Sequence, residues 1–243
     1  MSLPFALEDV SVERGGLLAV RTVSFANEGA GWIGIVGANG SGKTSLLRAI
    51  GGRLPIRSGR ILIGGADLSR DRAARAAAIG FAIDAAMLPG ELTPQEVFAI
   101  TARDRDAMDA PALAPLREAL GIDAFLDRTC GTLSAGMGQR VAIFAAFLDL
   151  PRIVILDEPF NWLDPLTAFD VKAALAGLVA AQGLTLLTAL HDVATLLACC
   201  SRGLLMADGA IALTIERAEL RAARADPIAF EAAMITRLRS TRA

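Results

Sequence analysis

The segment Gly37–Thr44, with the sequence GANGSGKT, restricts more than any other feature how this chain can fold. It holds the spacing G-x-x-x-x-G-K-[ST] and lies between an apolar run, Trp32–Val36, and an amphipathic run, Thr44–Ile50. A loop of this kind between a strand and a helix turns its backbone amides inward around phosphate oxygens, and the helix N-terminus adds the positive end of its dipole. We expect Lys43 to reach the outer phosphates of a nucleotide and the Thr44 hydroxyl to bind Mg²⁺.

The composition makes a chance match to this motif rare. Roughly 0.002 chance matches are expected, because the chain has 23 glycines but only two lysines, Lys43 and Lys172, beside 22 arginines. One of the two lysines thus occupies the position of the motif where a compact ammonium is wanted. The alternative interpretation is a glycine-rich turn that binds nothing.

A second pattern, the apolar run Ile153–Leu156, ends in two carboxylates, Asp157 and Glu158. A continuous apolar run of this length is typical of a buried parallel strand. By itself the pattern is weak, since any buried strand can end in acidic residues. Together with the phosphate loop it predicts that Asp157 holds Mg²⁺, directly or through water, and that Glu158 polarises an attacking water.

The segment Leu133–Arg140, with the sequence LSAGMGQR, opens a helix that we expect to run to Asp149. Ser134 is a favoured N-cap residue, which leaves free backbone amides at the helix start. On physical grounds alone, the simpler interpretation is a capped helix with no further role.

Strands alternate with helices along most of the chain, which predicts an α/β core. The expected strands are residues 5–12, 17–25, 32–36, 60–63, 79–83, 153–156, 184–189, 203–207 and 210–214. The first two form an antiparallel pair around the turn at Arg14, and the last two flank the hairpin signal Asp208-Gly209. Helices are expected throughout residues 93–150, over residues 165–182, from near His191, and in the tail after Glu216.

The composition excludes several classes of protein. A hydrophobic content of 53% excludes a disordered chain, and three cysteines in no metal-binding spacing exclude a disulfide framework and a zinc site. A net charge of −2, with 5% aromatic residues and no tyrosine, argues against a nucleic-acid groove. The apolar runs at 141–148 and 184–200 are too short or too interrupted to span a membrane, and no signal peptide is evident. We therefore expect a soluble, intracellular chain.

Together these motifs resemble the nucleotide-binding subunit of ATP-binding cassette (ABC) transporters over essentially the whole chain. Residues 37–44 resemble the Walker A motif, residues 153–158 the Walker B motif with its catalytic glutamate, and residues 133–139 the signature motif that marks this family. The segment Asn161–Asp164 is similar to the D-loop, and His191, the chain's only histidine, falls where the family's switch histidine belongs. Taken alone, His191 could equally be a satisfied histidine at the end of a strand.

The resemblance implies the P-loop ATPase fold called the ABC cassette, which is α/β with an N-terminal antiparallel β-subdomain. A helical subdomain is inserted at about residues 93–150, and residues 1–243 form a single domain.

ATP and Mg²⁺ are the implied ligands. The residues implied in ATP binding are Gly37, Ala38, Asn39, Gly40, Ser41, Gly42, Lys43, Thr44, Ser45, Arg14, Ser134 and Gly136. Those implied at the metal are Thr44, Asp157 and Asp84. Glu158 would activate the water, and His191 would contact the γ-phosphate.

The resemblance also implies a head-to-tail dimer with two ATP molecules in its interface. Ser134 and the amide of Gly136 would face the γ-phosphate bound by the other subunit, and Asp164 would link the two sites. Because the chain holds one cassette and no evident membrane segment, we expect as partners a second ABC ATPase subunit, identical or not, and a separate membrane permease. We expect no nucleic acid, and a cytoplasmic location on the inner face of the membrane.

Four features depart from the family's pattern. Asp84 replaces a glutamine and brings negative charge near the phosphates. The signature motif has Ala135 for a glycine and Met137 for a glutamine. Arg14 stands about where a tyrosine usually stacks on adenine and could stack through its guanidinium plane. Trp162 makes the D-loop bulkier.

Two other functions are compatible with the motifs. A soluble ABC-type ATPase outside transport would usually show a coiled-coil insertion, a tandem cassette or a basic surface, and none is visible in the sequence. A nucleotide-binding subunit with little hydrolysis, whose partner does the catalytic work, stays open as an alternative because of the changes at Asp84 and Met137.

Overall fold

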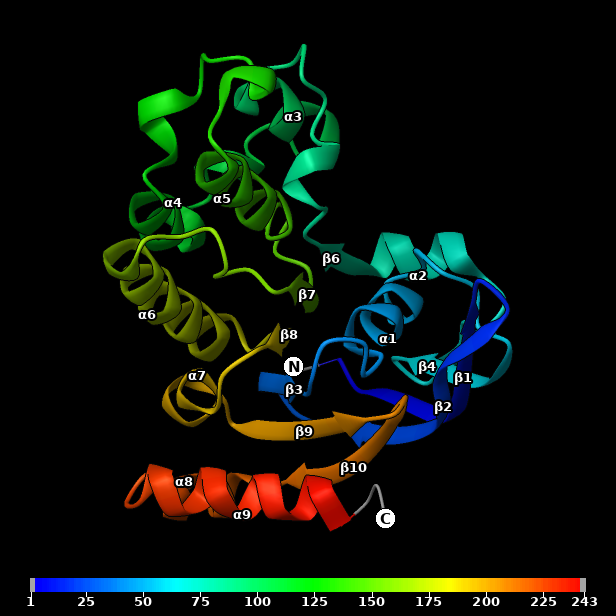
Figure 1. Ribbon diagram of the computed structural model, residues 1–243. Coiled ribbons are helices and arrows are strands. Elements are labelled where there is room, and N and C mark those ends of the chain that lie inside the picture. The colour runs from blue at the N-terminus through cyan, green and yellow to red at the C-terminus, as the bar shows by residue number, and fades with distance from the viewer. Residues whose placement is uncertain (1–2, 241–243) are drawn as a thin grey trace.

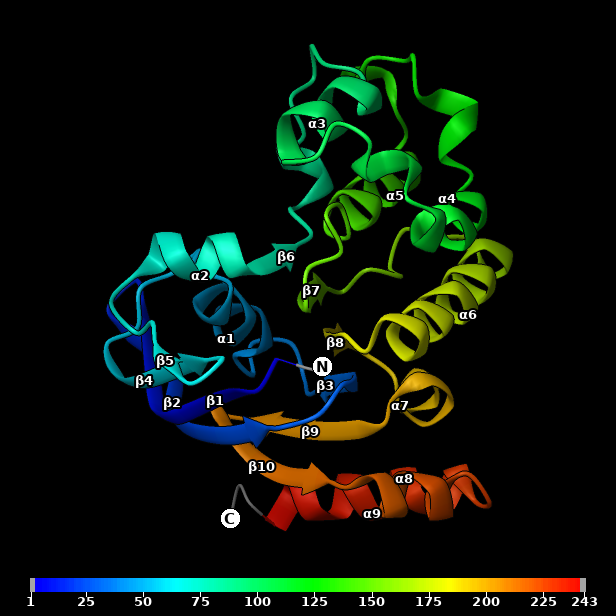
Figure 2. The same ribbon diagram turned by 180° about the vertical axis from the view of Figure 1, so that it is seen from behind.

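A six-stranded, mostly parallel sheet forms the centre of the molecule in the computed structural model, which describes residues 3–240 (Figures 1 and 2). Its strands, in spatial order, are β10 (Ala210–Ile215), β9 (Arg202–Ala207), β3 (Gly31–Val36), β8 (Thr185–Leu190), β7 (Ile153–Asp157) and β6 (Ile79–Phe81). Strands β9 to β6 are parallel to their neighbours, and β10 returns antiparallel to β9. The carboxyl ends of such strands meet at one edge, which is where an open α/β sheet binds ligands.

A second, antiparallel sheet covers one face of the first. Its strands, in spatial order, are β2 (Leu17–Asn27), β1 (Phe5–Arg14), β4 (Ser58–Ile63) and β5 (Ala66–Asp67). Helix α1 (Lys43–Ile50) contacts both sheets, so that the helix after the phosphate loop is anchored on two sides. The antiparallel pair predicted around Arg14 is confirmed.

Both faces of β3 are buried. Successive side chains of a strand point to opposite faces, so alternate residues of β3 enter two different cores. Ile33 and Ile35 join the core under the antiparallel sheet. Trp32 and Val36 join the other core, which helices α6 (Pro165–Gln182) and α7 (Val193–Cys199) cover. The Trp32 indole is only 2% exposed, and its Nε1 donates a hydrogen bond to Thr188 Oγ1 at 2.8 Å.

Helices are the only regular secondary structure in the segment between β6 and β7, at the top of Figure 1. The α-helices there are α3 (Pro94–Thr101), α4 (Ala114–Leu120) and α5 (Ala135–Ala145), joined by short 3₁₀ turns. Thr93 and Glu96 form a capping box at the start of α3, and Ser134 caps α5 by accepting a hydrogen bond from the Met137 amide at 3.2 Å. The N-cap predicted for Ser134 is thus confirmed.

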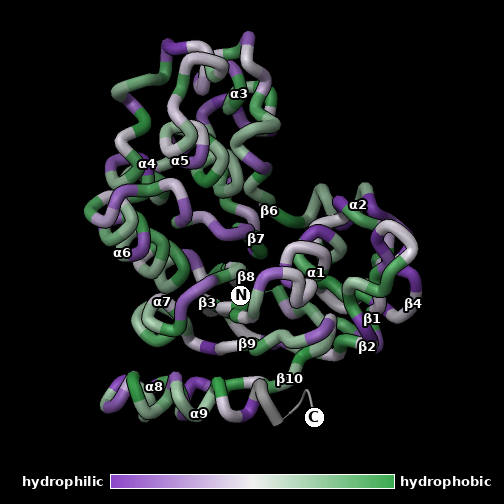
Figure 3. The backbone as a smooth tube through the Cα atoms, viewed as in Figure 1, coloured by the Kyte–Doolittle hydropathy of each residue, from purple (hydrophilic) through white to green (hydrophobic). Residues whose placement is uncertain are grey.

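Two helices complete the chain at the outer edge beside β10: α8 (Arg217–Ala223) and α9 (Pro227–Ser240). Hydrophilic and hydrophobic stretches lie side by side along them (Figure 3). Within residues 3–240, no helix combines the length and the apolar character that crossing a bilayer requires.

The expected fold class is confirmed, but several elements differ from the sequence prediction. Strand β6 ends at Phe81 rather than at residue 83, and the short strand β5 was not expected. The helix that begins after Ser134 ends at Ala145 rather than at Asp149. Asp149 and Leu150 have left-handed backbones, with φ of 61° and 48°, which no helix can continue. The Asp149 carboxylate instead accepts hydrogen bonds from the backbone amides of Arg103 and Asp104, at 2.8 and 3.1 Å.

Helix α2 (Arg72–Ala78) was not predicted, because its alanine-rich sequence shows no apolar periodicity. The helix is fixed instead by Arg75, which is wholly buried. Its Nη1 donates hydrogen bonds to the carbonyl oxygens of Leu68 and Ser69, at 2.5 and 2.6 Å. A buried guanidinium that bonds to backbone carbonyls leaves no signal in a hydrophobicity pattern.

Candidate functional site

The phosphate loop connects β3 to α1 in a conformation that requires glycine. Gly42 precedes the helix with φ of 101°, and a Cβ atom there would lie 2.4 Å from the carbonyl oxygen of Ala19. A Cβ atom on Gly37 would lie 2.4 Å from the carbonyl oxygen of Met206. The loop is therefore held between β2 and β9 with no room for side chains at these two positions.

Lys43 lies under this loop, only 4% exposed. Its Nζ donates hydrogen bonds to the carbonyl oxygens of Gly37 and Ala38, at 2.7 and 3.2 Å. Burial lowers the pKa of Lys43, while the carboxylates of Glu158 and Asp157 oppose that shift. A buried cation that is bonded only to neutral carbonyls favours an anionic ligand beside it.

The loop also holds a buried polar atom without a partner. Ser41 Oγ is shielded from solvent and has no hydrogen-bond partner within the described part of the chain. Buried hydroxyls are normally paired, so an unpaired one in a loop of this kind suits a ligand that brings its own oxygens. Together with Lys43, this arrangement fits the phosphates of ATP.

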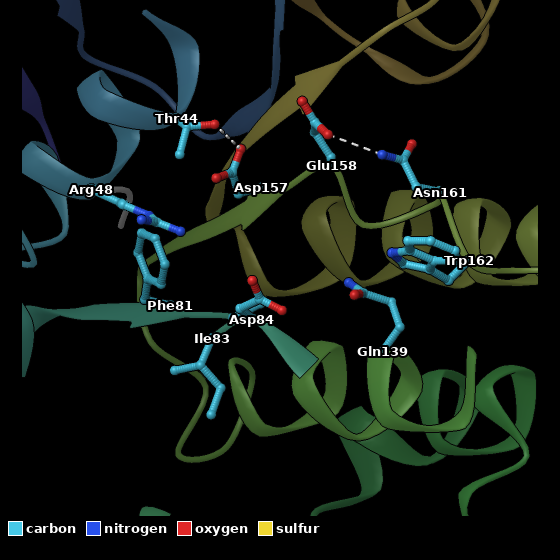
Figure 4. A pocket seen from close by; sticks show the side chains of 11 residues that line it. Thr44, Arg48, Phe81, Ile83, Asp84, Gln139, Asp157, Glu158, Asn161 and Trp162 are labelled. Carbon is cyan, nitrogen blue, oxygen red and sulfur yellow. Dashed lines mark hydrogen bonds between the residues drawn. The ribbon is translucent and has the colours of Figure 1, made fainter. Parts of the chain in front are cut away.

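Asp157, the last residue of β7, meets Thr44 from α1 at the same edge (Figure 4). The Thr44 hydroxyl donates a hydrogen bond to Asp157 Oδ1 at 3.1 Å. Burial raises the pKa of Asp157, and the hydrogen bond from Thr44 partly offsets that rise. Hydroxyl and carboxylate oxygens are the ligands that Mg²⁺ prefers, and Mg²⁺ usually takes its remaining oxygens from water and substrate phosphates. The described part of the chain contains no cluster of three or more His, Cys, Asp or Glu side chains that could hold a metal ion.

Glu158 is held from two sides. His191, which follows β8, places its Nε2 2.7 Å from Glu158 Oε2, and Asn161 Nδ2 donates a hydrogen bond to the same oxygen at 2.9 Å. The backbone of Glu158 is left-handed, with φ of 52°, a conformation that costs energy for a residue with a side chain. Strain of this kind persists only where the surroundings fix it. The partner role of Asn161 had not been predicted, since only the tertiary structure brings it to Glu158.

Arg14 lies at the end of β1 and lines one cavity of about 760 Å³ together with the phosphate loop. Ser45, Glu158 and His191 line the same cavity, so the structure brings these predicted residues together. Two exposed leucines, Leu17 and Leu18, also line it, and their apolar side chains were not predicted to take part.

Asp84 lines a neighbouring cavity of about 220 Å³, with Thr44, Arg48 and Asp157 among the other lining residues (Figure 4). It is exposed, and its Oδ1 accepts a hydrogen bond from the Ala86 amide at 3.0 Å. Asp84 thus reaches the space beside Asp157 from the segment after β6. Arg48 brings a cation into the same space, which the sequence had not singled out.

Ser134 is separate from the phosphate loop. It lines another cavity, of about 480 Å³, with Leu133, Ala135 and Gly138. Ser134 and Lys43 thus line different cavities within one chain, although Gln139, at the end of the signature segment, lines the cavity of Thr44 and Asp157.

Gly136 touches the D-loop of its own chain, since a Cβ atom there would lie 2.6 Å from the carbonyl oxygen of Trp162. Gly136→Ala must displace either α5 or this loop. We expect a lower melting temperature and slower ATP hydrolysis. Gly177→Ala, in α6, is the matched control because a Cβ there meets nothing within 4 Å. Thermal unfolding should show it stabilised by about 0.5–1 kcal/mol. If both variants are stabilised alike, the contact with Trp162 has no effect.

Known proteins resemble this chain over most of its length. The family model described as ABC transporter matches residues 20–161, more than half of the chain. The cytochrome c biogenesis ATP-binding export protein CcmA of Pseudomonas putida is 35% identical over 193 residues, which cover 79% of this chain and 92% of the relative. The phosphonates import ATP-binding protein PhnC of Rhizobium meliloti is 33% identical over 240 residues, which cover 90% of this chain and 84% of the relative.

Among solved structures, a dimeric ATP-binding cassette in a post-hydrolysis state, bound to ADP and Pi, has a similar fold. Its TM-score is 0.76 at 23% identity, over 88% of this chain and 98% of that chain. The matched segment of the family model contains the phosphate loop, Asp157 and Glu158 in the geometry described above. The chain therefore belongs to the ABC transporter family, as an ATP-binding subunit that hydrolyses ATP to power transport.

Proposed function

We propose that this subunit hydrolyses ATP as a head-to-tail dimer, in which each ATP lies between the phosphate loop of one copy and the signature segment of the other. The observation that carries the proposal is the separation of Lys43 and Ser134 within one chain, since the two residues line different cavities. A second copy is needed to bring Ser134 to a γ-phosphate bound at Lys43. The solved cassette of similar fold that holds ADP and Pi is itself dimeric, which supports a dimer here.

Within each site we assign distinct roles to the residues around β7. Thr44 and Asp157 hold Mg²⁺, which when bound neutralises charge on the phosphates. Glu158 takes a proton from the attacking water. Its Oε2 is occupied by Asn161 and His191, so that Oε1 is the oxygen directed to the water. His191 fixes Glu158 and contacts the γ-phosphate.

Mixing two inactive variants tests the shared site. Lys43→Ala damages the phosphate loop, and Ser134→Asp keeps a favoured N-cap while placing a negative charge opposite the γ-phosphate. In a mixed dimer, the loop of the Ser134→Asp chain faces the intact signature of the Lys43→Ala chain. We expect the mixture to hydrolyse ATP although neither variant does so alone. Activity no greater than that of the two variants measured separately would contradict the head-to-tail arrangement.

We further propose that residues 1–243 form one domain, with a helical subdomain at about residues 93–150, and that the dimer works on a separate permease at the inner face of the membrane. The absence of a spanning helix in the described residues and the family membership support this. On cell fractionation, the chain should sediment with membranes when its permease is co-expressed and stay in the supernatant without it. Equal recovery in the soluble fraction with and without that protein would speak against the permease.

We also propose that Asp84 takes part in the metal site. Its carboxylate adds negative charge beside Asp157, so that ATP binding should depend unusually strongly on Mg²⁺. We expect Asp84→Asn to weaken this dependence by about 1 kcal/mol or more, roughly five-fold in apparent affinity. Asp84→Gln should do the same, and Asp170→Asn, an exposed change of the same kind on α6, should not. ATP affinity titrated against Mg²⁺ measures the effect. Superimposable curves for wild type and Asp84→Asn would remove Asp84 from the metal site.

A further inference from the structure

Lys172 is the only lysine outside the phosphate loop, and it lies between two segments that lead to the candidate site. It is half-buried on α6. Its Nζ donates a hydrogen bond to Thr195 Oγ1 at 2.8 Å and lies 4.9 Å from the centre of the Phe160 ring. The ammonium therefore has a hydroxyl partner on one side and an aromatic face on the other.

The aromatic contact leads to Glu158. Phe160 stands two residues after Glu158, next to Asn161, which hydrogen-bonds the Glu158 carboxylate. The Phe160 ring also packs against the buried Trp32, with centroids 6.4 Å apart. Phe160 thus contacts both the core and Lys172, and it belongs to the turn that follows the strained backbone of Glu158.

The hydroxyl contact leads to His191. Thr195 is buried in the first turn of α7, and its amide donates a hydrogen bond to the N-cap residue Asp192 at 2.5 Å. Asp192 directly follows His191 in the chain. A displacement of Thr195 therefore moves the segment that carries the imidazole. Helices α6 and α7 are adjacent in both views of the ribbon diagram (Figures 1 and 2). The hydrogen bond from Lys172 on α6 to Thr195 on α7 joins them.

We propose that Lys172 is a positioning residue for ATP hydrolysis, which ties the turn after Glu158 to the start of α7 and so keeps Glu158 and His191 in contact. The inference rests on the proposed roles of Glu158 and His191. A lysine suits this place better than an arginine. A compact ammonium can donate a hydrogen bond to Thr195 while it faces the Phe160 ring, whereas the donors of an arginine lie fixed in the plane of its guanidinium group. The chain has 22 arginines and only two lysines, so a lysine at this position departs from the chain's usual basic residue.

The sole histidine makes the proposal directly measurable. The imidazole proton resonances in an NMR spectrum belong to His191 alone. Lys172→Met keeps most of the aliphatic stem and removes the ammonium, and we expect it to shift or broaden these resonances. We also expect kcat to fall by about 10-fold while KM for ATP stays within about two-fold, since small misplacements of catalytic groups slow chemistry more than binding.

Thr195→Val and Phe160→Leu remove one contact each and should give smaller changes in the same direction. The double variant of Lys172→Met with Thr195→Val should be less than additive, because both remove one hydrogen bond.

The exposed change Asp170→Asn, two residues away on the same helix, is the control and should leave resonances and kcat unchanged. If Lys172→Met does not fold, the milder Thr195→Val carries the test. A folded Lys172→Met or Thr195→Val with a lowered melting temperature but unchanged imidazole resonances and kcat would overturn the proposal and leave a purely structural role. Failure of the proposed catalytic role is seen separately. In that case Glu158→Gln would still hydrolyse ATP, whatever the resonances show.

Discussion

Glu158→Gln is expected to lower ATP turnover by on the order of 10²-fold or more while ATP binding is retained. Glutamine keeps the shape of the side chain and can still accept the hydrogen bond from Asn161, but it cannot take a proton from water. Because hydrolysis is then blocked after ATP has bound, the variant should accumulate as an ATP-bound dimer. Steady-state phosphate release measures turnover, and light scattering after size-exclusion chromatography measures the dimer.

The control for Glu158→Gln is Glu91→Gln, the same chemical change at an exposed residue in the turn before α3. It should leave turnover and the monomer–dimer distribution as in wild type. Turnover of Glu158→Gln at the wild-type rate would show that another group activates the water. Loss of both binding and turnover would mean that the carboxylate is needed to build the site.

Lys43→Met is expected to weaken ATP binding by about 10- to 100-fold, the equivalent of roughly 1.5–3 kcal/mol for charged hydrogen bonds. Methionine keeps most of the stem beneath the loop, so that the loop keeps its packing. Burial already lowers the pKa of Lys43, which shows that the ammonium is costly in the free protein. Removing it should therefore leave the melting temperature without nucleotide unchanged or higher.

Calorimetric titration with ATP and Mg²⁺ measures the loss for Lys43→Met, and circular dichroism checks the fold. Equal affinity in both proteins would remove the lysine from the phosphate site. Weaker ATP binding together with an intact or stabilised fold would show that the substitution acts on binding and not on folding.

The strand–loop–helix unit around Gly37–Thr44 could be predicted from the sequence because its causes are local. Gly42 stands where the backbone is left-handed and another strand passes 2.4 Å from a Cβ position. The buried strand at Ile153–Leu156 could be predicted for a similar reason. Ile153 and Ile155 enter one core and Val154 and Leu156 the other, so that every position is apolar.

The remaining features depend on tertiary contacts that no local pattern encodes. Glu158 and His191 meet only because β7 and β8 are neighbours in the sheet. Helix α2 depends on Arg75, whose partners are backbone carbonyls. Lys172 could be noted as unusual in the sequence, but its two partners lie on separate segments.

The contrast between the two tryptophans gives the protein an optical signal of its own. With no tyrosine in the chain, ultraviolet emission comes from Trp32 and Trp162. Trp32 is 2% exposed and hydrogen-bonded in the core, whereas Trp162 is 66% exposed in the D-loop. Trp32 therefore acts as a constant, blue-emitting reference that iodide cannot quench, and Trp162 supplies the red-shifted, quenchable component. If the ATP-bound dimer covers the D-loop, iodide will quench Trp162 less after ATP is added. The change in quenching would report dimer formation in real time, without any attached dye.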